Sequence, residues 1–195
     1  MTPSKASIRK HALERRDLVS PAEAHEAASA IVPASLALIR RLFGEARPKV
    51  ALYWPIRSEL DTWPLIEALA ARGFPILLPA MTAVRRPLEF RAFAPGDELE
   101  KGPFGLSEPS RDRPEDRPEI VLAPLAAFDR RGLRLGYGGG IYDATLQALR
   151  GQGPVTAVGL AFALQECEAL PREAHDQRLD FIVTERETIE CLHAA

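Results

Sequence analysis

The chain has 195 residues, of which 46% are hydrophobic, and its formal net charge is −2. This length and hydrophobic content predict one globular domain, residues 1–195, with a substantial core. The near-neutral charge argues against nucleic-acid binding through bulk positive charge, although 25 lysine and arginine residues can still form a local basic site. No apolar run approaches the ~20 residues of a membrane span, and the N-terminus lacks the apolar core of a signal peptide.

The two cysteines, Cys167 and Cys191, are too few for a disulfide framework and form no CxxC motif. Free thiols of this kind are typical of a reducing cytosol. We therefore expect a cytoplasmic protein that binds neither membranes nor nucleic acid. A monomer and a small-molecule substrate are expected as well.

The N-terminal part of the chain predicts two helices, over residues 4–18 and 21–43. Ser4 and Ser20 stand where the N-caps of these helices would be, and both are residues that accept hydrogen bonds from the first helical turn. Pro33 should kink or interrupt the second helix, because proline has no N–H and its ring crowds the preceding turn.

From residue 49 onwards, short apolar runs alternate with helical segments and turns. The order strand, helix, strand indicates parallel pairing, so we expect a three-layer α/β/α, Rossmann-like domain with a mostly parallel sheet. Residues 107–118, rich in proline and charged residues, are expected to form an exposed linker within the domain. Strands are predicted at 49–54, 74–79, 88–93, 119–124, 155–160 and, as the last strand, 181–184, with helices at 62–71 and from the glycine-rich loop to Arg150.

A glycine-rich loop between a predicted strand and a predicted helix is the most informative segment. Residues 128–143 read Phe-Asp-Arg-Arg-Gly-Leu-Arg-Leu-Gly-Tyr-Gly-Gly-Gly-Ile-Tyr-Asp. Glycines let the backbone approach an anion closely, and the N–H groups at a helix start attract it. The four glycines from Gly136 to Gly140 exceed what a simple turn needs, yet they match neither Walker A nor GxGxxG. We predict a phosphate site to which Arg134 adds a fixed positive charge.

Several charged or aromatic residues have both a functional and a simpler interpretation. Asp143, in the first turn after the loop, can complement the helix dipole or bind Mg²⁺ beside phosphates. Lys5 and Arg9, four residues apart, form either a solvated basic face or part of a phosphate site. Glu59 and Trp54 follow a strand end, where ligands of α/β sheets bind, but a surface carboxylate and a core tryptophan are the alternatives.

The glycine-rich loop resembles the signature loop of 5-formyltetrahydrofolate cyclo-ligases, and the resemblance extends over nearly the whole chain. Where the family usually has Tyr-Tyr-Asp-Arg, this chain has Ile141-Tyr142-Asp143-Ala144, so one tyrosine and one positive charge are missing. Further pieces match in the expected order: Lys5-x-x-x-Arg9, Tyr53-x-Pro-x-x-x-Glu59-x-Asp-Thr62, Val158-Gly-Leu-Ala-Phe162 with Gln165, Leu170-Pro-x-x-x-His-Asp176, and Asp180 to Glu185.

The resemblance implies the reaction. ATP phosphorylates the formyl oxygen of 5-formyltetrahydrofolate, the other folate nitrogen attacks the activated carbon, and phosphate leaves. The products are 5,10-methenyltetrahydrofolate, ADP and phosphate. An amide-like oxygen is a very poor leaving group, so phosphorylation is chemically reasonable, and the protein supplies positioning and charge neutralisation.

The resemblance also implies roles for individual residues. Asp143 and Asp176 are the expected Mg²⁺ ligands, and Arg134 and Tyr142 are the expected catalytic residues. Folate is expected to contact Trp54, Glu59, Tyr137 and Tyr142, with Glu59 hydrogen-bonded to the pterin ring. ATP is expected to contact Lys5, Arg9, Arg134, Leu135, Gly136, Tyr137, Gly138, Gly139, Gly140, Ile141 and Tyr142.

Two other functions remain open on the residues alone. A phosphate-binding sugar isomerase or CoA-transferase-like enzyme would need a catalytic carboxylate near the loop but no ATP. A non-catalytic folate- or nucleotide-binding protein would need only the pocket. Covalent catalysis has little support, because the chain has no G-x-S-x-G motif and no evident Cys–His pair.

Overall fold

A seven-stranded sheet forms the centre of the computed structural model, which describes residues 4–83, 86–102 and 105–192. The five neighbouring strands from β10 to β2 are parallel, whereas the two edge strands pair antiparallel. The spatial order is β11 (Thr188–Glu190), β10 (Phe181–Val183), β9 (Thr156–Leu160), β6 (Ile120–Pro124), β1 (Val50–Ala51), β2 (Ile76–Ala80) and β3 (Glu89–Phe93).

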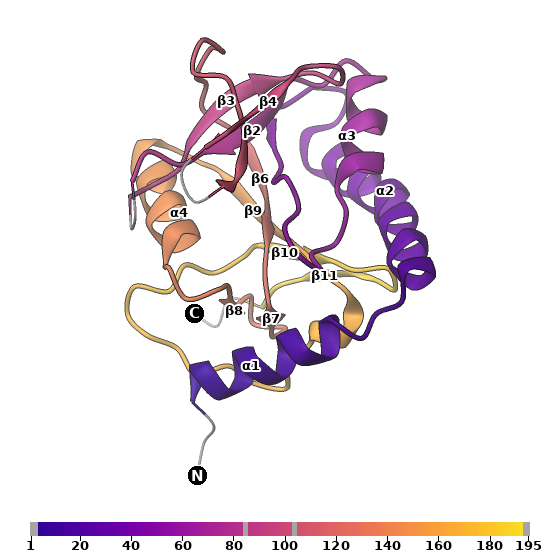
Figure 1. Ribbon diagram of the computed structural model, residues 1–195, viewed down its shortest axis with the longest axis vertical. Coiled ribbons are helices and arrows are strands. Elements are labelled where there is room, and N and C mark those ends of the chain that lie inside the picture. The colour runs from indigo at the N-terminus through magenta and orange to yellow at the C-terminus, as the bar shows by residue number, and fades with distance from the viewer. Residues whose placement is uncertain (1–3, 84–85, 103–104, 193–195) are drawn as a thin grey trace.

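Helices cover both faces of this sheet (Figure 1). The helices α2 (Pro21–Phe43) and α3 (Trp63–Ala70) lie on one face and α4 (Ile141–Gln152) on the other. Ile120 packs into the cluster with α2 and α3, and the next residue, Val121, packs into the cluster with α4. Both faces of a parallel sheet are buried in this way because crossover helices cover them. The predicted three-layer, mostly parallel α/β fold is confirmed.

The N-terminal helices begin as their caps predict. The Ser4 hydroxyl accepts a hydrogen bond from the first turn of α1 (Lys5–Arg16), and Ser20 forms a capping box with Glu23 at the start of α2. The predicted interruption at Pro33 is wrong, because α2 continues through it. Pro33 lies on the exposed side of the helix, where water can bind the carbonyl that loses its N–H partner. No helix among the described residues is long and apolar enough to cross a membrane.

Two expectations about the later part of the chain need correction. The segment predicted as an exposed linker is exposed at residues 111–116, but it begins with the strand β5 (Ser107–Pro109), which pairs with β4 (Leu99–Lys101). Glu108 is buried and accepts a 2.9 Å hydrogen bond from the N–H of Met81. The strand at 181–184 is followed by β11, a short edge strand that buries only one side chain. Such short, polar strands carry too little apolar alternation to be recognised before their partners are known.

A two-stranded hairpin directly precedes the glycines of the loop. It pairs β7 (Ala127–Phe128) with β8 (Arg134–Leu135). In the turn between them, the fully buried Asp129 carboxylate accepts hydrogen bonds from three backbone N–H groups and from the guanidinium of Arg131. Gly132 has φ 79°, and a Cβ there would lie 2.3 Å from the carbonyl oxygen of Leu179. The turn therefore requires glycine both for its backbone angle and for its packing.

Replacing Gly132 with alanine should lower the free energy of unfolding by about 2 kcal/mol or more, because the new methyl group overlaps backbone that cannot move freely. Gly44→Ala is the matched control, since Gly44 also has positive φ but nothing lies within 4 Å of its Cβ position. Urea unfolding of both variants checks the expectation. Equal destabilisation of the two would contradict a packing role for Gly132.

Candidate functional site

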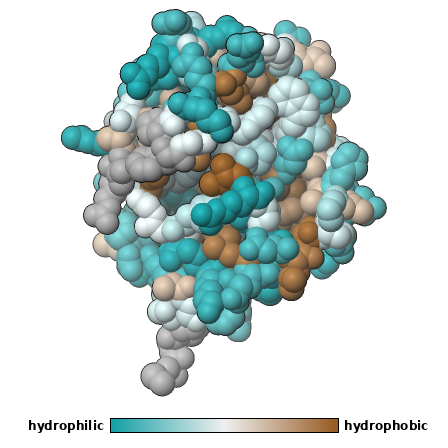
Figure 2. Space-filling view, viewed as in Figure 1, coloured by the Kyte–Doolittle hydropathy of each residue, from teal (hydrophilic) through white to brown (hydrophobic). Residues whose placement is uncertain are grey.

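A cavity of about 570 Å³ opens beyond the carboxyl ends of β1, β2 and β6, where α1 and the glycine-rich loop meet. All the residues predicted to bind ATP, folate or metal line this one cavity, although they come from distant parts of the chain. On this face of the molecule, hydrophobic side chains reach the surface among hydrophilic ones (Figure 2). Ligands of parallel α/β sheets bind at this edge because the loops that follow the strands converge there.

The glycine-rich loop presents its backbone to this cavity. Gly138 and Gly140 have φ 101° and 65°, and nothing lies within 4 Å of a Cβ built at Gly136 or Gly140. Among the described residues, no side chain caps the N-terminus of α4, so its first N–H groups remain available. The Arg9 Nε donates a 2.6 Å hydrogen bond to the carbonyl oxygen of Gly136, which holds this guanidinium against the loop. The arrangement suits an anion.

The residues on either side of the loop are joined by an ion pair. Arg134 Nη2 lies 3.0 Å from Asp143 Oδ1, which also accepts a 2.9 Å hydrogen bond from the N–H of Gln177. Arg134 Nη1 donates to the carbonyl oxygen of Gln177, and the Arg134 side chain is only 3% exposed. Burial lowers the pKa of Arg134 and the charge of Asp143 opposes this. Asp143 Oδ2 has no hydrogen-bond partner among the described residues and remains free for a ligand.

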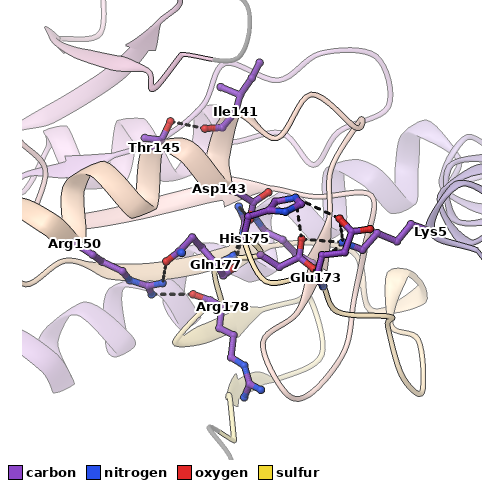
Figure 3. A network of polar contacts seen from close by, with 11 residues as sticks. Lys5, Ile141, Asp143, Thr145, Arg150, Glu173, His175, Gln177 and Arg178 are labelled. Carbon is purple, nitrogen blue, oxygen red and sulfur yellow. Dashed lines mark hydrogen bonds and ion pairs between the residues drawn. The ribbon is translucent and has the colours of Figure 1, made fainter.

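Lys5 and Asp176 form an ion pair at the same end of the cavity as Asp143, because Asp176 precedes Gln177, whose backbone contacts both Asp143 and Arg134. Figure 3 shows Lys5 beside Glu173 and His175. The ammonium of Lys5 donates to both carboxylate oxygens of Asp176, at 2.8 and 2.7 Å, and lies 3.3 Å from Glu173. Partial burial opposes the charge of Asp176, but the hydrogen bonds from Lys5 and from the Glu173 N–H keep its pKa below the usual value. The ligand atoms of Glu173, His175 and Asp176 lie within 4.8 Å of one another, a spacing that a cation could bridge.

Glu59 is the carboxylate at the other end of the cavity, on the loop that follows β1. Burial raises its pKa to about 7, against the opposing effects of the 2.9 Å hydrogen bond from the Ile56 N–H and of the nearby Arg16 and Arg57 charges. A carboxyl group that titrates near neutral pH is unusual and marks functional sites. Here it can accept hydrogen bonds from a ligand once it is ionised.

Aromatic and apolar side chains form the walls around Glu59. Trp54 is half-buried and packs edge-on against Trp63 and Phe93, with ring centroids 5.8 and 6.3 Å away. It therefore packs into the core and also lines the cavity, and its contact with a ligand stays a prediction. Burial raises the pKa of Tyr142 far above its ordinary value, so its hydroxyl stays protonated. The apolar lining is completed by Ile56, Pro79, Met81, Leu88, Leu106 and Ile141.

Gln165, which belongs to one of the sequence pieces that match the family, is not among the residues that line the cavity. Its side chain is 1% exposed. The amide donates to the carbonyl oxygens of Leu125 and Ala126, at 2.7 and 3.0 Å, and accepts a hydrogen bond from the N–H of Phe162. Gln165 thus supports the segment between β6 and β7 from behind.

The residue pattern alone did not identify Arg16, which is 1% exposed and donates to the hydroxyl of Tyr137 at 2.6 Å. The spacing of basic residues in α1 could have identified Arg16 as a candidate. Lys5, Arg9 and Arg16 are separated by four and seven residues, which places all three on one face of α1. Arg57, at the cavity rim, has φ 53° and was also missed. Its strained backbone cannot be inferred from residue type, because positive φ is rare in arginine.

Comparison with known proteins agrees with this geometry. The model of the 5-formyltetrahydrofolate cyclo-ligase family matches residues 1–185. The chain is 31% identical to the 5-formyltetrahydrofolate cyclo-ligase of Haemophilus influenzae over 180 residues, covering 90% of this chain and 94% of that protein. It is 38% identical to the Escherichia coli protein of the same name over 140 residues, covering 69% of this chain and 76% of that protein.

The fold is also similar to solved structures of 5,10-methenyltetrahydrofolate synthetases. The 5,10-methenyltetrahydrofolate synthetase of Aquifex aeolicus matches with a TM-score of 0.75 and 28% identity, over 96% of this chain and 92% of that one. The synthetase of Mycoplasma pneumoniae shares the fold, with a TM-score of 0.73 at 22% identity, over 94% of this chain and 99% of that one. With the family model extending across the whole cavity, from Lys5 to Asp176, the chain belongs to the 5-formyltetrahydrofolate cyclo-ligase family.

Proposed function

We propose that this protein converts 5-formyltetrahydrofolate to 5,10-methenyltetrahydrofolate in a reaction that uses ATP and Mg²⁺. One observation carries the proposal beyond family membership. A glycine-rich loop with an open backbone and a partly buried carboxyl group whose pKa is raised to about 7 face the same cavity, bordered by apolar walls. A site of this kind can hold a phosphate donor and a flat, polar heterocycle side by side, as phosphoryl transfer between them requires.

Folate binding is proposed for the end of the cavity that contains Glu59. The pterin ring presents a pair of N–H donors that an ionised carboxylate can accept together. Trp54, Tyr137 and Tyr142 supply aromatic surface for the flat ring around this carboxylate. Because burial raises the pKa of Glu59, its charge is poorly solvated, and a bound donor pair would restore the hydrogen bonds that water no longer supplies.

ATP phosphates are proposed to bind the loop from Gly136 to Gly140 together with the N-terminus of α4. The open backbone at Gly136 and Gly140 supports this, as does the guanidinium of Arg9, held against the loop through its Nε. The Arg9 Nη atoms make no hydrogen bond to any described residue and can reach an anion. Lys5 would contribute a second charge by exchanging Asp176 for a phosphate oxygen.

Mg²⁺ fits the carboxylates at the phosphate end. Asp143 keeps one oxygen free of hydrogen bonds to the described residues, and Asp176 would be released when Lys5 turns to phosphate. Mg²⁺ commonly takes one or two carboxylates together with substrate phosphates, so this donor set suits it. We propose Asp143 and Asp176 as its ligands. The ion would neutralise phosphate charge during transfer.

The proposed roles in the chemical step follow from charge and protonation. Arg134 stays charged and fixed behind Asp143, so it supplies a positive field at the phosphate end without needing to reorganise. The hydroxyl of Tyr142 remains protonated because burial raises its pKa, and it can donate to an oxygen that gains negative charge. Exclusion of water by the apolar walls would protect the phosphorylated formyl group from hydrolysis.

A cytoplasmic setting and a monomeric state are proposed with the function. Both cysteines are free thiols, and Cys191 is buried, which agrees with a reducing compartment.

The reaction itself can be tested by the absorbance of the methenyl product after purified protein is mixed with 5-formyltetrahydrofolate and Mg²⁺. We expect product and ADP in equal amounts when ATP is present, and no product when ATP is left out. Folate-independent ATP hydrolysis would contradict the proposal. Folate binding without product would contradict it as well and would favour the non-catalytic binding protein.

Changing Glu59 to glutamine should weaken folate binding by about 10–100-fold and leave ATP binding nearly unchanged, because charge-assisted hydrogen bonds to the pterin are lost. In the wild-type protein, folate affinity should also fall by about tenfold between pH 8 and pH 6, as the carboxyl protonates near pH 7. The variant should show no such change. Isothermal titration at both pH values checks this, with the exposed Glu26→Gln as control. Equal loss of ATP and folate binding would contradict a specific role of Glu59 in folate binding.

Changing Asp143 to asparagine should cut turnover strongly and raise the Mg²⁺ concentration for half-maximal activity by about tenfold or more, because a neutral amide is a weaker ligand for a hard cation. Steady-state rates measured over a Mg²⁺ series check this. Asp112→Asn removes an exposed acid outside the cavity and should leave the Mg²⁺ dependence unchanged. Unaltered kinetics in the Asp143 variant would remove it from the metal site.

A further inference from the structure

A buried arginine links α1 to the glycine-rich loop. Arg16, in the last turn of α1, is 1% exposed and among the largest fully buried side chains. Its Nε donates to the hydroxyl of Ser58 at 3.1 Å, Nη1 to the carbonyl oxygen of Leu125 at 3.3 Å, and Nη2 to the hydroxyl of Tyr137 at 2.6 Å. One side chain thus joins the helix, the loop after β1, the end of β6 and the glycine-rich loop.

The charge of Arg16 is not neutralised by a carboxylate in direct contact. Among the described residues, no acid lies within ion-pair distance of it, and Asp17 is reached only through the hydroxyl of Ser58. Burying a guanidinium without a counter-ion is costly, and an apolar side chain of similar size would pack at lower cost. The positive charge therefore has a use beyond packing, and its field points toward the cavity that Tyr137 lines.

The hydrogen bond between Arg16 and Tyr137 has only one possible direction. A guanidinium has donors and no acceptor, so the phenol oxygen of Tyr137 must accept. Its own proton must then point elsewhere, and no other described residue accepts it. Tyr137 is 39% exposed and faces the cavity, with the guanidinium of Arg57 also 5.3 Å from its ring centroid. The Tyr137 hydroxyl can therefore donate a hydrogen bond to a ligand in the cavity.

We propose that Arg16 is a positioning residue that makes Tyr137 a fixed, polarised hydrogen-bond donor to the phosphoryl group in transfer between nucleotide and folate. The proposal rests on the proposed function. Tyr137 stands between Gly136 and Gly138 of the phosphate loop, and the charge of Glu59 acts on it from the folate end. The donor therefore lies where the two substrates meet. Such a donor acts most strongly when negative charge develops on the oxygen it contacts, so its loss reduces kcat more than it raises KM.

The kinetic test is a double-mutant cycle with Arg16→Met and Tyr137→Phe. Each single variant should lose about 10–100-fold in kcat with a smaller change in either KM. The double variant should be little worse than Tyr137→Phe, because Arg16 acts through that hydroxyl. Arg15→Met, at the exposed neighbouring position, should retain full activity. Multiplication of the two losses, or a loss confined to KM, would overturn the proposal.

A titration of tyrosine absorbance tests the pairing without using activity. The charged groups that act on the Tyr137 hydroxyl are Arg16 from α1 and Arg57 and Glu59 from the loop after β1; burial raises its pKa, and Arg16 lowers it. Tyr137→Phe identifies the titration step. Arg16→Met should shift that step to higher pH, whereas Arg16→Lys, which keeps the charge, should shift it less. An unshifted step in folded Arg16→Met, or in the neutral Arg16→Gln if Arg16→Met does not fold, would overturn the proposal.

The two hypotheses fail in different ways. If the wild-type protein makes no methenyl product with ATP, the proposed function is wrong, and the titration still decides whether Arg16 controls the Tyr137 hydroxyl. If the wild-type protein is active but Tyr137→Phe is equally active, the function stands and the role of Tyr137 as a donor is wrong.

Discussion

The ion pair between Arg134 and Asp143 is the interaction on which the site depends. These two residues flank the glycine-rich loop, and their contact closes the loop at its base, with the backbone of Gln177 hydrogen-bonded to both. A loop of four glycines would otherwise pay a large entropic cost to hold its N–H groups in one direction. Because the pair is largely buried, water does not compete with it effectively. The same contact orients Asp143 so that one carboxylate oxygen remains open.

Charged side chains around the cavity form ion pairs with one another. A charged ligand that binds there can replace one member of a pair, so no charge is left without a partner. Lys5 lies on Asp176, and Arg134 lies on Asp143, so these two cations each already have an acid. A nucleotide with its metal would bring both signs of charge at once, so that phosphate can replace an acid and the metal can replace a cation. Arg9 and Arg16 are the exceptions, because their partners are neutral oxygens. A positive charge with no carboxylate in direct contact favours negative charge in the cavity.

Much of the fold could be read from local patterns. The caps at Ser4 and Ser20 and the buried runs that became β2, β6 and β9 each depend on residues close together in the sequence, so periodicity and capping chemistry were sufficient. The strands β5 and β11 could not be read in this way. Glu108 is buried because the N–H of Met81 needs an acceptor, and that need exists only after distant segments have packed.

The sequence by itself determined the chemistry available to this protein: a glycine-rich loop before a helix, acids beside it, and an α/β chain that places loops at one edge of a sheet. Those features depend on residue type and on short spacings. Only the tertiary structure decided how the groups pair and which of them are buried. Arg16 looks like any helical arginine until the Tyr137 hydroxyl is brought against it, and the pKa of Glu59 is raised to about 7 only because the folded chain removes water from it. Desolvation and hydrogen-bond direction arise between segments far apart in the chain, and no local pattern encodes them.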